Sequence, residues 1–159
     1  TRWILVNSKP VFTDGVEKPT SVFTTFDDIS TQKSNELQIK NSAERMELIF
    51  NQTGLAWWDF NIETKLVKAS PRKGKMLGYD DIDEEQELEF WTGKIHPDDH
   101  EAAMKAMKDH LEGKVSEYNI SYRIQHKDGH YIKLRDKGEV IERTEKGTPL
   151  RVIGTVSTI

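Results

Sequence analysis

The first twenty-nine residues of this chain resemble its last twenty-nine, and this internal similarity constrains the fold more than any other feature. When Thr1 is placed opposite Tyr131 without a gap, four pairs are identical: Pro19 and Pro149, Val22 and Val152, Thr25 and Thr155, Ile29 and Ile159. The apolar pattern agrees more widely, and in a strand that pattern fixes which face is buried. Because similarity at a fixed spacing marks a repeated unit, the sequence predicts the same pair of strands twice.

The repeat predicts three segments. Residues 1–29 are interpreted as the C-terminal hairpin of a preceding domain, residues 30–52 as a connecting helix, and residues 53–159 as a complete domain whose C-terminal part begins near residue 116. Strand signals in "TRWILVNSKPVF" and "TSVFTTF" flank the turn signals of "TDGVEKP". A hairpin alone is only marginally stable in water, so we expect residues 1–29 either to be disordered or to pair with another sheet.

Residues 30–52 contain good helix formers and neither Gly nor Pro. Their apolar residues recur at helical spacing and form a one-sided stripe of Ile39, Ala43, Met46 and Phe50. Two interpretations stay open. The stripe packs against the helix's own domain, or it pairs with a second chain in a coiled coil, for which it offers fewer than three heptads. The second interpretation predicts a homodimer that forms through this helix and transmits a signal along it.

Composition excludes several classes of function. The net charge of −4 and the mixed distribution of charges argue against a nucleic-acid binder, which would carry a basic face. No apolar run approaches the roughly 18 residues of a membrane-spanning helix, so no membrane contact is predicted. The absence of cysteine from the sequence excludes disulfides, thiolate metal sites and cysteine nucleophiles, and a cytoplasmic location is the simplest interpretation.

The order of elements after residue 53 predicts an α+β domain. Two strands, "GLAWWDFNI" and "KLVKAS", precede short helical pieces in residues 71–95 and a longer helix over residues 97–112. Three strands follow, and the turn signal Asp128-Gly129 joins the first two as a hairpin. Two groups of strands around the helices predict a five-stranded antiparallel sheet with the helices on one face.

From Leu55 onward the sequence resembles a PAS domain with its C-terminal PAC part. The resemblance rests on "WWDFN" in the first strand, "KMLGY" in the first short helix, "IHPDDH" at the longer helix, "YRIQHKDGHY" across the hairpin and "GTV" in the last strand. In addition, "FDDISTQK" at residues 26–33 resembles the end of one PAS domain and the start of the helix that leads to the next. The sequence departs from the family pattern at Ala56 and Lys133, where Trp is frequent, and at Thr158, where the pattern has Asp.

The resemblance implies a sensory and signalling module of a multidomain receptor, most often the sensor histidine kinase of a two-component system. The expected partners are then the neighbouring PAS and kinase domains of the same parent protein. This segment carries neither a phosphoacceptor helix nor an ATP-binding domain, so no enzyme activity is expected of it. The sequence shows no phosphate-binding glycine loop and no catalytic triad, and we assign no catalytic residue.

Two cofactors of the family can be tested against the residues. A cysteinyl-flavin adduct is excluded, because the sequence has no cysteine. Haem is not expected, because the position of the family's iron-ligating His falls near Ala102 or Ala103, and both His100 and His110 are offset from it. His100 shares a helical stripe with Met104 and is interpreted as a helix-start residue with one polar partner.

The segment "HPDDH" raises the question of a metal site. His96 and His100 stand four residues apart with two carboxylates between them, which is compatible with metal binding. Pro97 suits the first helical turn, and Asp98 with Glu101 resembles a capping box, so the start of a helix already explains the segment. We therefore predict no metal site, and we interpret the acidic run "DDIDEEQELE" as a solvated face.

The remaining candidate site is the interior between the sheet and the helices. Inward-facing residues of both are predicted to meet there: Trp58, Phe60, Met76, Leu77, Trp91, Met104, Met107, Ile120, Tyr122 and Ile124. They form either a packed core or the wall of a small-molecule cavity, and aromatic and methionine side chains suit both. The first alternative corresponds to a ligand-free module for dimerisation or protein–protein interaction. The second corresponds to a sensor whose ligand the sequence leaves unknown.

Overall fold

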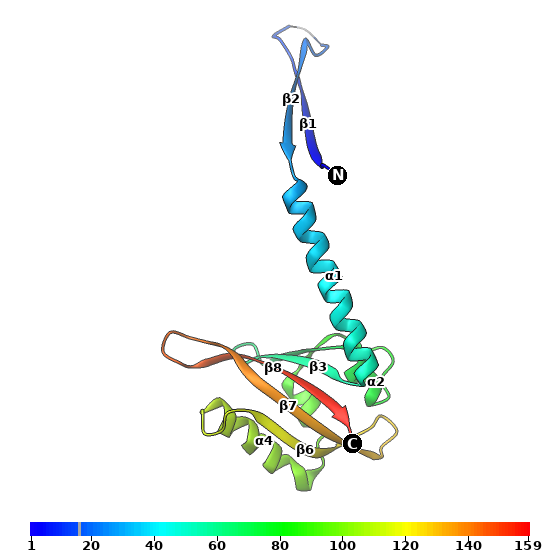
Figure 1. The fold of residues 1–159 in the computed structure, drawn as a ribbon, viewed down its shortest axis with the longest axis vertical. Helices are drawn as coiled ribbons and strands as arrows, with labels where there is room; N and C mark the ends of the chain where they lie inside the picture. The colour runs from blue at the N-terminus through cyan, green and yellow to red at the C-terminus, as the bar shows by residue number, and fades with distance from the viewer. Residues whose placement is uncertain (16) are drawn as a thin grey trace. The chain divides into compact units, whose positions relative to one another are not determined.

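The computed structural model describes residues 1–15 and 17–159, which form two compact units, Thr1–Leu48 and Ile49–Ile159 (Figure 1). Helix α1 (Ser30–Thr53) belongs mostly to the first unit and contributes its last residues to the second. Within the described residues, no helix is both long enough and apolar enough to cross a membrane.

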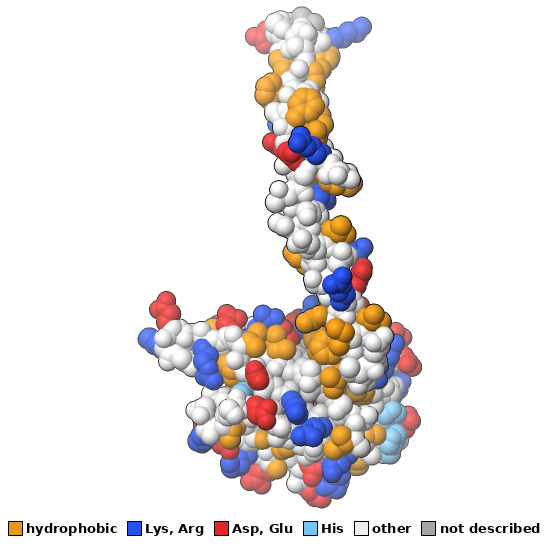
Figure 2. Space-filling model, viewed as in Figure 1, with side chains coloured by type: hydrophobic (Ala, Val, Ile, Leu, Met, Phe, Trp, Pro, Cys, Tyr) orange, Lys and Arg blue, Asp and Glu red, His pale blue; other side chains and the backbone are white. Residues whose placement is uncertain are grey.

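The first unit is a hairpin followed directly by a helix. Strands β1 (Ile4–Val11) and β2 (Ser21–Asp28) are antiparallel and form a sheet of two strands. Their apolar side chains remain open to solvent, and Phe26 is 68% exposed. Figure 2 shows hydrophobic side chains on the surface along this unit. The hairpin is therefore formed, but within the described chain it has no core of its own.

The second unit is built on an antiparallel sheet of six strands in the order β5-β4-β3-β8-β7-β6. The strands are β3 (Ala56–Asn61), β4 (Leu66–Ala69), β5 (Glu85–Glu87), β6 (Tyr118–Gln125), β7 (Tyr131–Arg143) and β8 (Pro149–Thr158). The helices are α2 (Pro71–Met76), α3 (Leu88–Thr92) and α4 (Pro97–Leu111). The predicted α+β architecture is confirmed. The sheet has one strand more than expected, because β5, part of the acidic run, pairs with β4 at the edge.

The two hairpins share one pairing register. Pairs that lie 130 positions apart correspond along both ladders: Ile4–Asp28 and Leu134–Thr158, Val6–Phe26 and Asp136–Val156, Asn7–Thr25 and Lys137–Thr155, Pro10–Val22 and Val140–Val152. The backbone hydrogen bond at the end of each ladder also joins corresponding residues in the two hairpins. The amide of Ile29 donates to the carbonyl of Trp3 (3.0 Å), and the amide of Ile159 donates to that of Lys133 (3.1 Å). The apolar pattern shared by the two segments is thus accompanied by shared backbone geometry.

One core joins the inward face of the sheet to the helices. Strand β3 alternates, so that Ala56, Trp58 and Phe60 are buried on one face. Leu77, directly after α2, and Trp91 from α3 belong to the same cluster of buried side chains. The helices therefore cover the face of the sheet on which β3 places its large apolar side chains.

Two glycines make room for the ring of Trp58. Gly138 in β7 lies opposite Gly154 in β8, and Trp58 pairs with Gly154 from the other side. A Cβ atom at Gly138 would lie 2.7 Å from the indole ring, so a side chain there would displace it. The ring also meets Tyr118 edge-to-face, with 6.2 Å between the centroids. This packing directs Trp58 toward the middle of β7.

Candidate functional site

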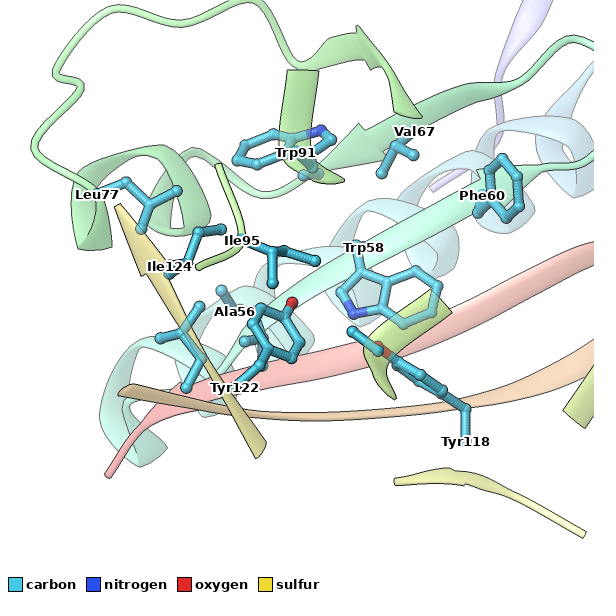
Figure 3. Close-up of a cluster of buried hydrophobic side chains, with 14 of the residues drawn as sticks. Ala56, Trp58, Phe60, Val67, Leu77, Trp91, Ile95, Tyr118, Tyr122 and Ile124 are labelled. Atoms are coloured by element: carbon cyan, nitrogen blue, oxygen red, sulfur yellow. The ribbon is translucent and has the colours of Figure 1, made fainter. Parts of the chain in front are cut away.

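A cavity of about 70 Å³ lies between the inward face of the sheet and helices α3 and α4 (Figure 3). Aromatic side chains dominate its wall, with Trp58, Tyr118 and Tyr122 contributed by strands and Trp91 by α3. The volume is about half of the ~150 Å³ that accommodates benzene in an engineered cavity. The space therefore suits a group of a few non-hydrogen atoms.

Most of the predicted pocket residues lie on this wall: Trp58, Phe60, Trp91, Met104, Met107, Tyr122 and Ile124. Leu77 is buried within the core, and Met76 and Ile120 pack against the core, so these three do not line the cavity. Two charged residues of the wall, Lys73 and Asp136, were not predicted from the sequence. Neither was identifiable from its type, because charged residues in helices and strands ordinarily face solvent.

Asp136, on β7, is a buried carboxylate that positions two aromatic residues. The indole N–H of Trp58 donates to Oδ1 and the hydroxyl of Tyr122 donates to Oδ2, each over 2.7 Å. Burial raises the pKa of Asp136, and the nearby charge of Lys73 opposes that rise. Burial also raises the pKa of Tyr122 well above its usual value, so its hydroxyl keeps the proton that it donates. The carboxylate thereby fixes the orientation of both rings.

Lys73, on α2, brings an ammonium group into the aromatic wall. Its side chain is buried, and Nζ lies 4.1 Å from the ring centre of Trp91 and 5.9 Å from that of Trp58. Burial lowers the pKa of Lys73 to about 8, and the charge of Asp136 opposes this shift. Cation–π contacts and a more distant carboxylate are weak compensation for a desolvated charge. A hydrogen-bond acceptor in the cavity would stabilise the protonated form.

The indole nitrogen of Trp91 is buried and, among the described residues, has no hydrogen-bond partner. Buried donors are nearly always paired, because an unpaired one costs about 1–3 kcal/mol. Its ring lies across the cavity from residues of the sheet (Figure 3). Two residues of the wall therefore carry unsatisfied polar groups: Trp91 has a buried donor without a partner in the described chain, and Lys73 is an incompletely compensated cation.

An open groove of about 730 Å³ adjoins the cavity. The two share five residues of their walls, namely Phe60, Leu88, Thr92, Met104 and Met107. Met104 is 37% exposed, and methionine side chains adapt readily to a change of shape. Rotation of Met104 and Met107 therefore offers a route from the surface into the cavity.

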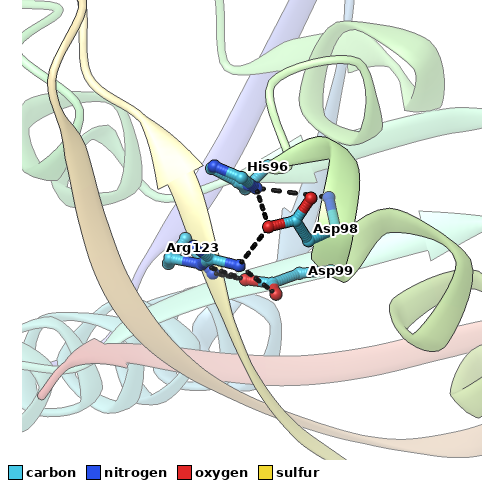
Figure 4. A network of polar contacts seen from close by, with 4 residues as sticks. All are labelled: His96, Asp98, Asp99 and Arg123. Atoms are coloured by element: carbon cyan, nitrogen blue, oxygen red, sulfur yellow. Dashed lines mark hydrogen bonds and ion pairs between the residues drawn. The ribbon is translucent and has the colours of Figure 1, made fainter.

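The "HPDDH" segment fastens α4 to β6 (Figure 4). Asp99 accepts hydrogen bonds from Nε, Nη2 and the backbone amide of Arg123, each over 2.8 Å, which hold the pKa of Asp99 well below its usual range. Nη2 of Arg123 also lies 3.3 Å from Asp98. The predicted capping box of Asp98 and Glu101 is wrong, because the helix begins earlier. Its N-cap is His96, whose Nδ1 accepts from the amide of Asp98 (3.2 Å).

The two histidines considered for haem ligation occupy other environments. His100 is exposed on the first turn of α4. His110, near the end of α4, is buried, and its Nε2 accepts from the amide of Val140 (3.1 Å). Nδ1 therefore carries the proton and faces the carbonyl of Val115 (3.3 Å). Both ring nitrogens of His110 join backbone groups, so its role in the described chain is structural.

A protein-family profile described as PAS fold matches residues 66–156. No curated protein matches the sequence. Among solved structures, a sensory box histidine kinase/response regulator from Burkholderia thailandensis is 27% identical, with a TM-score of 0.63, and the match covers 72% of this chain and 84% of that one.

Two further structures extend the comparison. The N-terminal domain of a diguanylate cyclase with PAS/PAC sensor from Marinobacter aquaeolei is also 27% identical, with a TM-score of 0.57 over 65% of this chain and 94% of that one. The PAS domain of a protein from Colwellia psychrerythraea is 16% identical, with a TM-score of 0.56 over 74% and 96% of the two chains. At that identity the likeness concerns the fold alone.

Proposed function

Because the chain belongs to the PAS-fold family, we propose that it is the sensory module of a multidomain signalling receptor and binds a small ligand in the cavity beside Trp91. The unpaired indole N–H of Trp91 carries this proposal. A core that served packing alone would keep that donor unpaired at a cost of about 1–3 kcal/mol. A ligand that accepts from it would remove the cost.

The wall favours a small, flat molecule with a hydrogen-bond acceptor or a negative charge. Trp91 offers a donor and Lys73 a positive charge, while Trp58 and Tyr118 offer apolar ring surface. Both oxygens of Asp136 already accept hydrogen bonds, so it is a less available partner for a ligand. Ligands larger than the cavity would have to displace the methionines shared with the groove.

Native and then denaturing mass spectrometry of the purified protein, with a visible absorption spectrum, tests the proposal. We expect a small molecule to be released on denaturation. Trp91→Phe keeps the ring and removes the N–H, so it should retain less of that molecule than the wild type does. A clean polypeptide mass and a colourless sample would contradict ligand binding, and equal retention by Trp91→Phe would contradict the role of Trp91.

The exposed apolar stripe of α1 supports a second candidate, a ligand-free module for dimerisation or protein interaction. Ala103 separates the two candidates, because it is buried on the cavity wall. If the cavity is empty, the larger side chain of Ala103→Leu would fill part of it and would be tolerated. If a ligand occupies the cavity, the leucine side chain would compete with that ligand and lower its occupancy.

We further propose that the parent protein is a cytosolic sensor histidine kinase and that α1 relays the signal between its domains. The similarity to a sensory box histidine kinase supports this, although the similar diguanylate cyclase domain belongs to a protein named for a different activity. The test is transfer of phosphate from ATP to a histidine of the intact parent protein. An intact protein that makes no phosphohistidine would contradict the assignment.

We also propose that residues 1–29 are the C-terminal hairpin of a preceding PAS domain. The shared pairing register with β7 and β8 supports this. In that register Val6 takes the place of Asp136, so the preceding domain would lack the buried carboxylate at this position. The interior of the preceding domain would then be less polar at this position than the interior of the domain that contains Asp136.

A further inference from the structure

Two histidines and an aspartate gather at the tip of the hairpin between β6 and β7, away from the cavity. His126 follows β6, Asp128 lies in the turn, and His130 precedes β7. One potential ligand atom from each residue lies within 4.8 Å of those of the other two. From the sequence this segment is predicted only as a hairpin turn, and "HPDDH" is the only segment that raises the question of a metal site.

Backbone hydrogen bonds fix the tip. The amide of His126 donates to the carbonyl of His130, and the amide of Gly129 donates to the carbonyl of His126, both over 2.8 Å. Gly129 has φ +92°, a conformation that favours glycine and closes the turn tightly. This turn brings residues 126 and 130 opposite each other, and their two imidazole rings are stacked with 4.4 Å between their centroids and 28° between their planes.

The ring of His126 is positioned by packing. It lies over Gly78, where a Cβ atom would be 3.2 Å from Nδ1 and closer still to Cε1 and Nε2. The amide of Lys127 donates to the carbonyl of Leu77 (2.8 Å), which ties the tip to the end of α2. Asp128 and His130 are exposed, and a carboxylate oxygen of Asp128 lies 3.4 Å from Nδ1 of His126. One potential ligand is thus rigid and two are able to rotate toward it.

We propose that His126, Asp128 and His130 bind a divalent transition-metal ion, for which zinc is the best suited. Two imidazoles and one carboxylate supply three protein ligands and leave a fourth tetrahedral position for water. Nitrogen ligands do not suit magnesium or calcium, which prefer oxygen throughout. To close around the ion, the exposed side chains of Asp128 and His130 must rotate toward His126, whose Nδ1 otherwise accepts from the amide of Asp128 (3.3 Å).

The proposed metal site shares no residue with the wall of the proposed ligand cavity, but a backbone hydrogen bond links the two regions. The bond from Lys127 to Leu77 joins the tip to α2, and α2 carries Lys73 into the cavity wall. A metal ion that tightens the tip should therefore slow amide hydrogen exchange at Lys127 and Gly129.

Isothermal titration calorimetry of the untagged protein with zinc chloride, and separately with magnesium chloride, tests the site. We expect saturable one-to-one binding of zinc and none of magnesium. His130→Gln and Asp128→Asn should each weaken zinc binding by roughly tenfold or more. Both side chains are exposed, so thermal unfolding without metal should match the wild type.

His100→Gln is the matched control, since it removes an exposed histidine of the "HPDDH" segment. Zinc binding that is unchanged in His100→Gln and weakened in the hairpin variants supports the site. Absence of zinc binding by the wild type overturns it. Zinc binding that is undiminished in the double variant His130→Gln/Asp128→Asn also overturns the site. Loss of zinc binding in His100→Gln alone overturns it as well, and either result places zinc elsewhere in the protein.

Discussion

The unusual residues of this domain are two ionisable side chains buried beside aromatic rings. Burial favours the neutral form of both Lys73 and Asp136, while each charge stabilises the other. Asp136 also accepts hydrogen bonds from Trp58 and Tyr122. The carboxylate is therefore the centre of the polar interior, and its removal should affect all three neighbours.

Replacement of Asp136 tests this arrangement. Asp136→Leu leaves two donors without an acceptor and Lys73 without a compensating charge, so we expect the free energy of unfolding to fall by about 3–5 kcal/mol. The double variant Asp136→Leu/Lys73→Met should recover part of that loss, because it also removes the buried cation. Urea unfolding measures both, and equal destabilisation of the single and double variants would show that Lys73 and Asp136 are not coupled.

The pKa of Lys73 predicts a dependence of stability on pH. Burial lowers it from 10.5 to about 8, so between these values the unfolded chain holds a proton that the folded chain has released. The free energy of unfolding should therefore rise with pH across this window. Across this window the free energy of unfolding of the wild type should rise by at most about 3 kcal/mol more than that of Lys73→Met. Urea unfolding at about pH 8 and about pH 10.5 measures it, and parallel behaviour of the two proteins would contradict the prediction.

At the scale of elements, α1 stands out because none of its residues is buried. A helix in a folded protein usually gains most of its stability by packing an apolar face. Two residues of the predicted stripe, Ile39 and Met46, are exposed within the described chain. The homodimer through this helix stays a prediction, and these side chains are where it would form.

A charge on the stripe tests the homodimer. Met46→Glu should lower the molar mass in solution toward that of one chain, because a buried carboxylate would oppose pairing of the stripes. The control is Asn41→Glu, which adds the same charge on the other side of the helix. Light scattering after size-exclusion chromatography gives the mass. An identical mass for wild type and Met46→Glu would exclude pairing through this stripe.

At the scale of the whole molecule, the two units differ in their hydrophobic content. Buried residues such as Val152 and Val156 form the core of the second unit, whereas the apolar residues of the first hairpin are exposed. Stability should therefore be distributed unequally between the units.

Amide hydrogen exchange measures this difference. We expect residues 4–11 and 21–28 to exchange much faster than β3, β7 and β8, because the part of the chain that the structure describes leaves both strands of the first hairpin uncovered. If the protein is extended to include a preceding domain, exchange in the first hairpin should slow. Slow exchange in the present chain would instead show that the hairpin is already covered by another surface, such as a second copy.

The sequence by itself determined the elements and most of their order. Alternation of apolar residues marked the strands, the absence of Gly and Pro marked the helix over residues 30–52, and Asp128-Gly129 marked the hairpin turn. These signals are local, because each depends on residues within a few positions of one another. The sequence pattern did not predict the short edge strand β5, because its acidic residues have low strand propensity and only pairing with β4 makes it a strand.

The tertiary structure alone decided which polar groups meet. Lys73 and Asp136 lie 63 positions apart, and nothing near either of them in the sequence shows that both face the cavity. His126 and His130 were visible as neighbours, but only the backbone of the turn and the space over Gly78 stack their rings. Burial and contact between distant residues depend on how the sheet and helices pack, which a local pattern does not encode. The apolar faces were therefore predictable, whereas the chemistry of the cavity and of the hairpin tip was not.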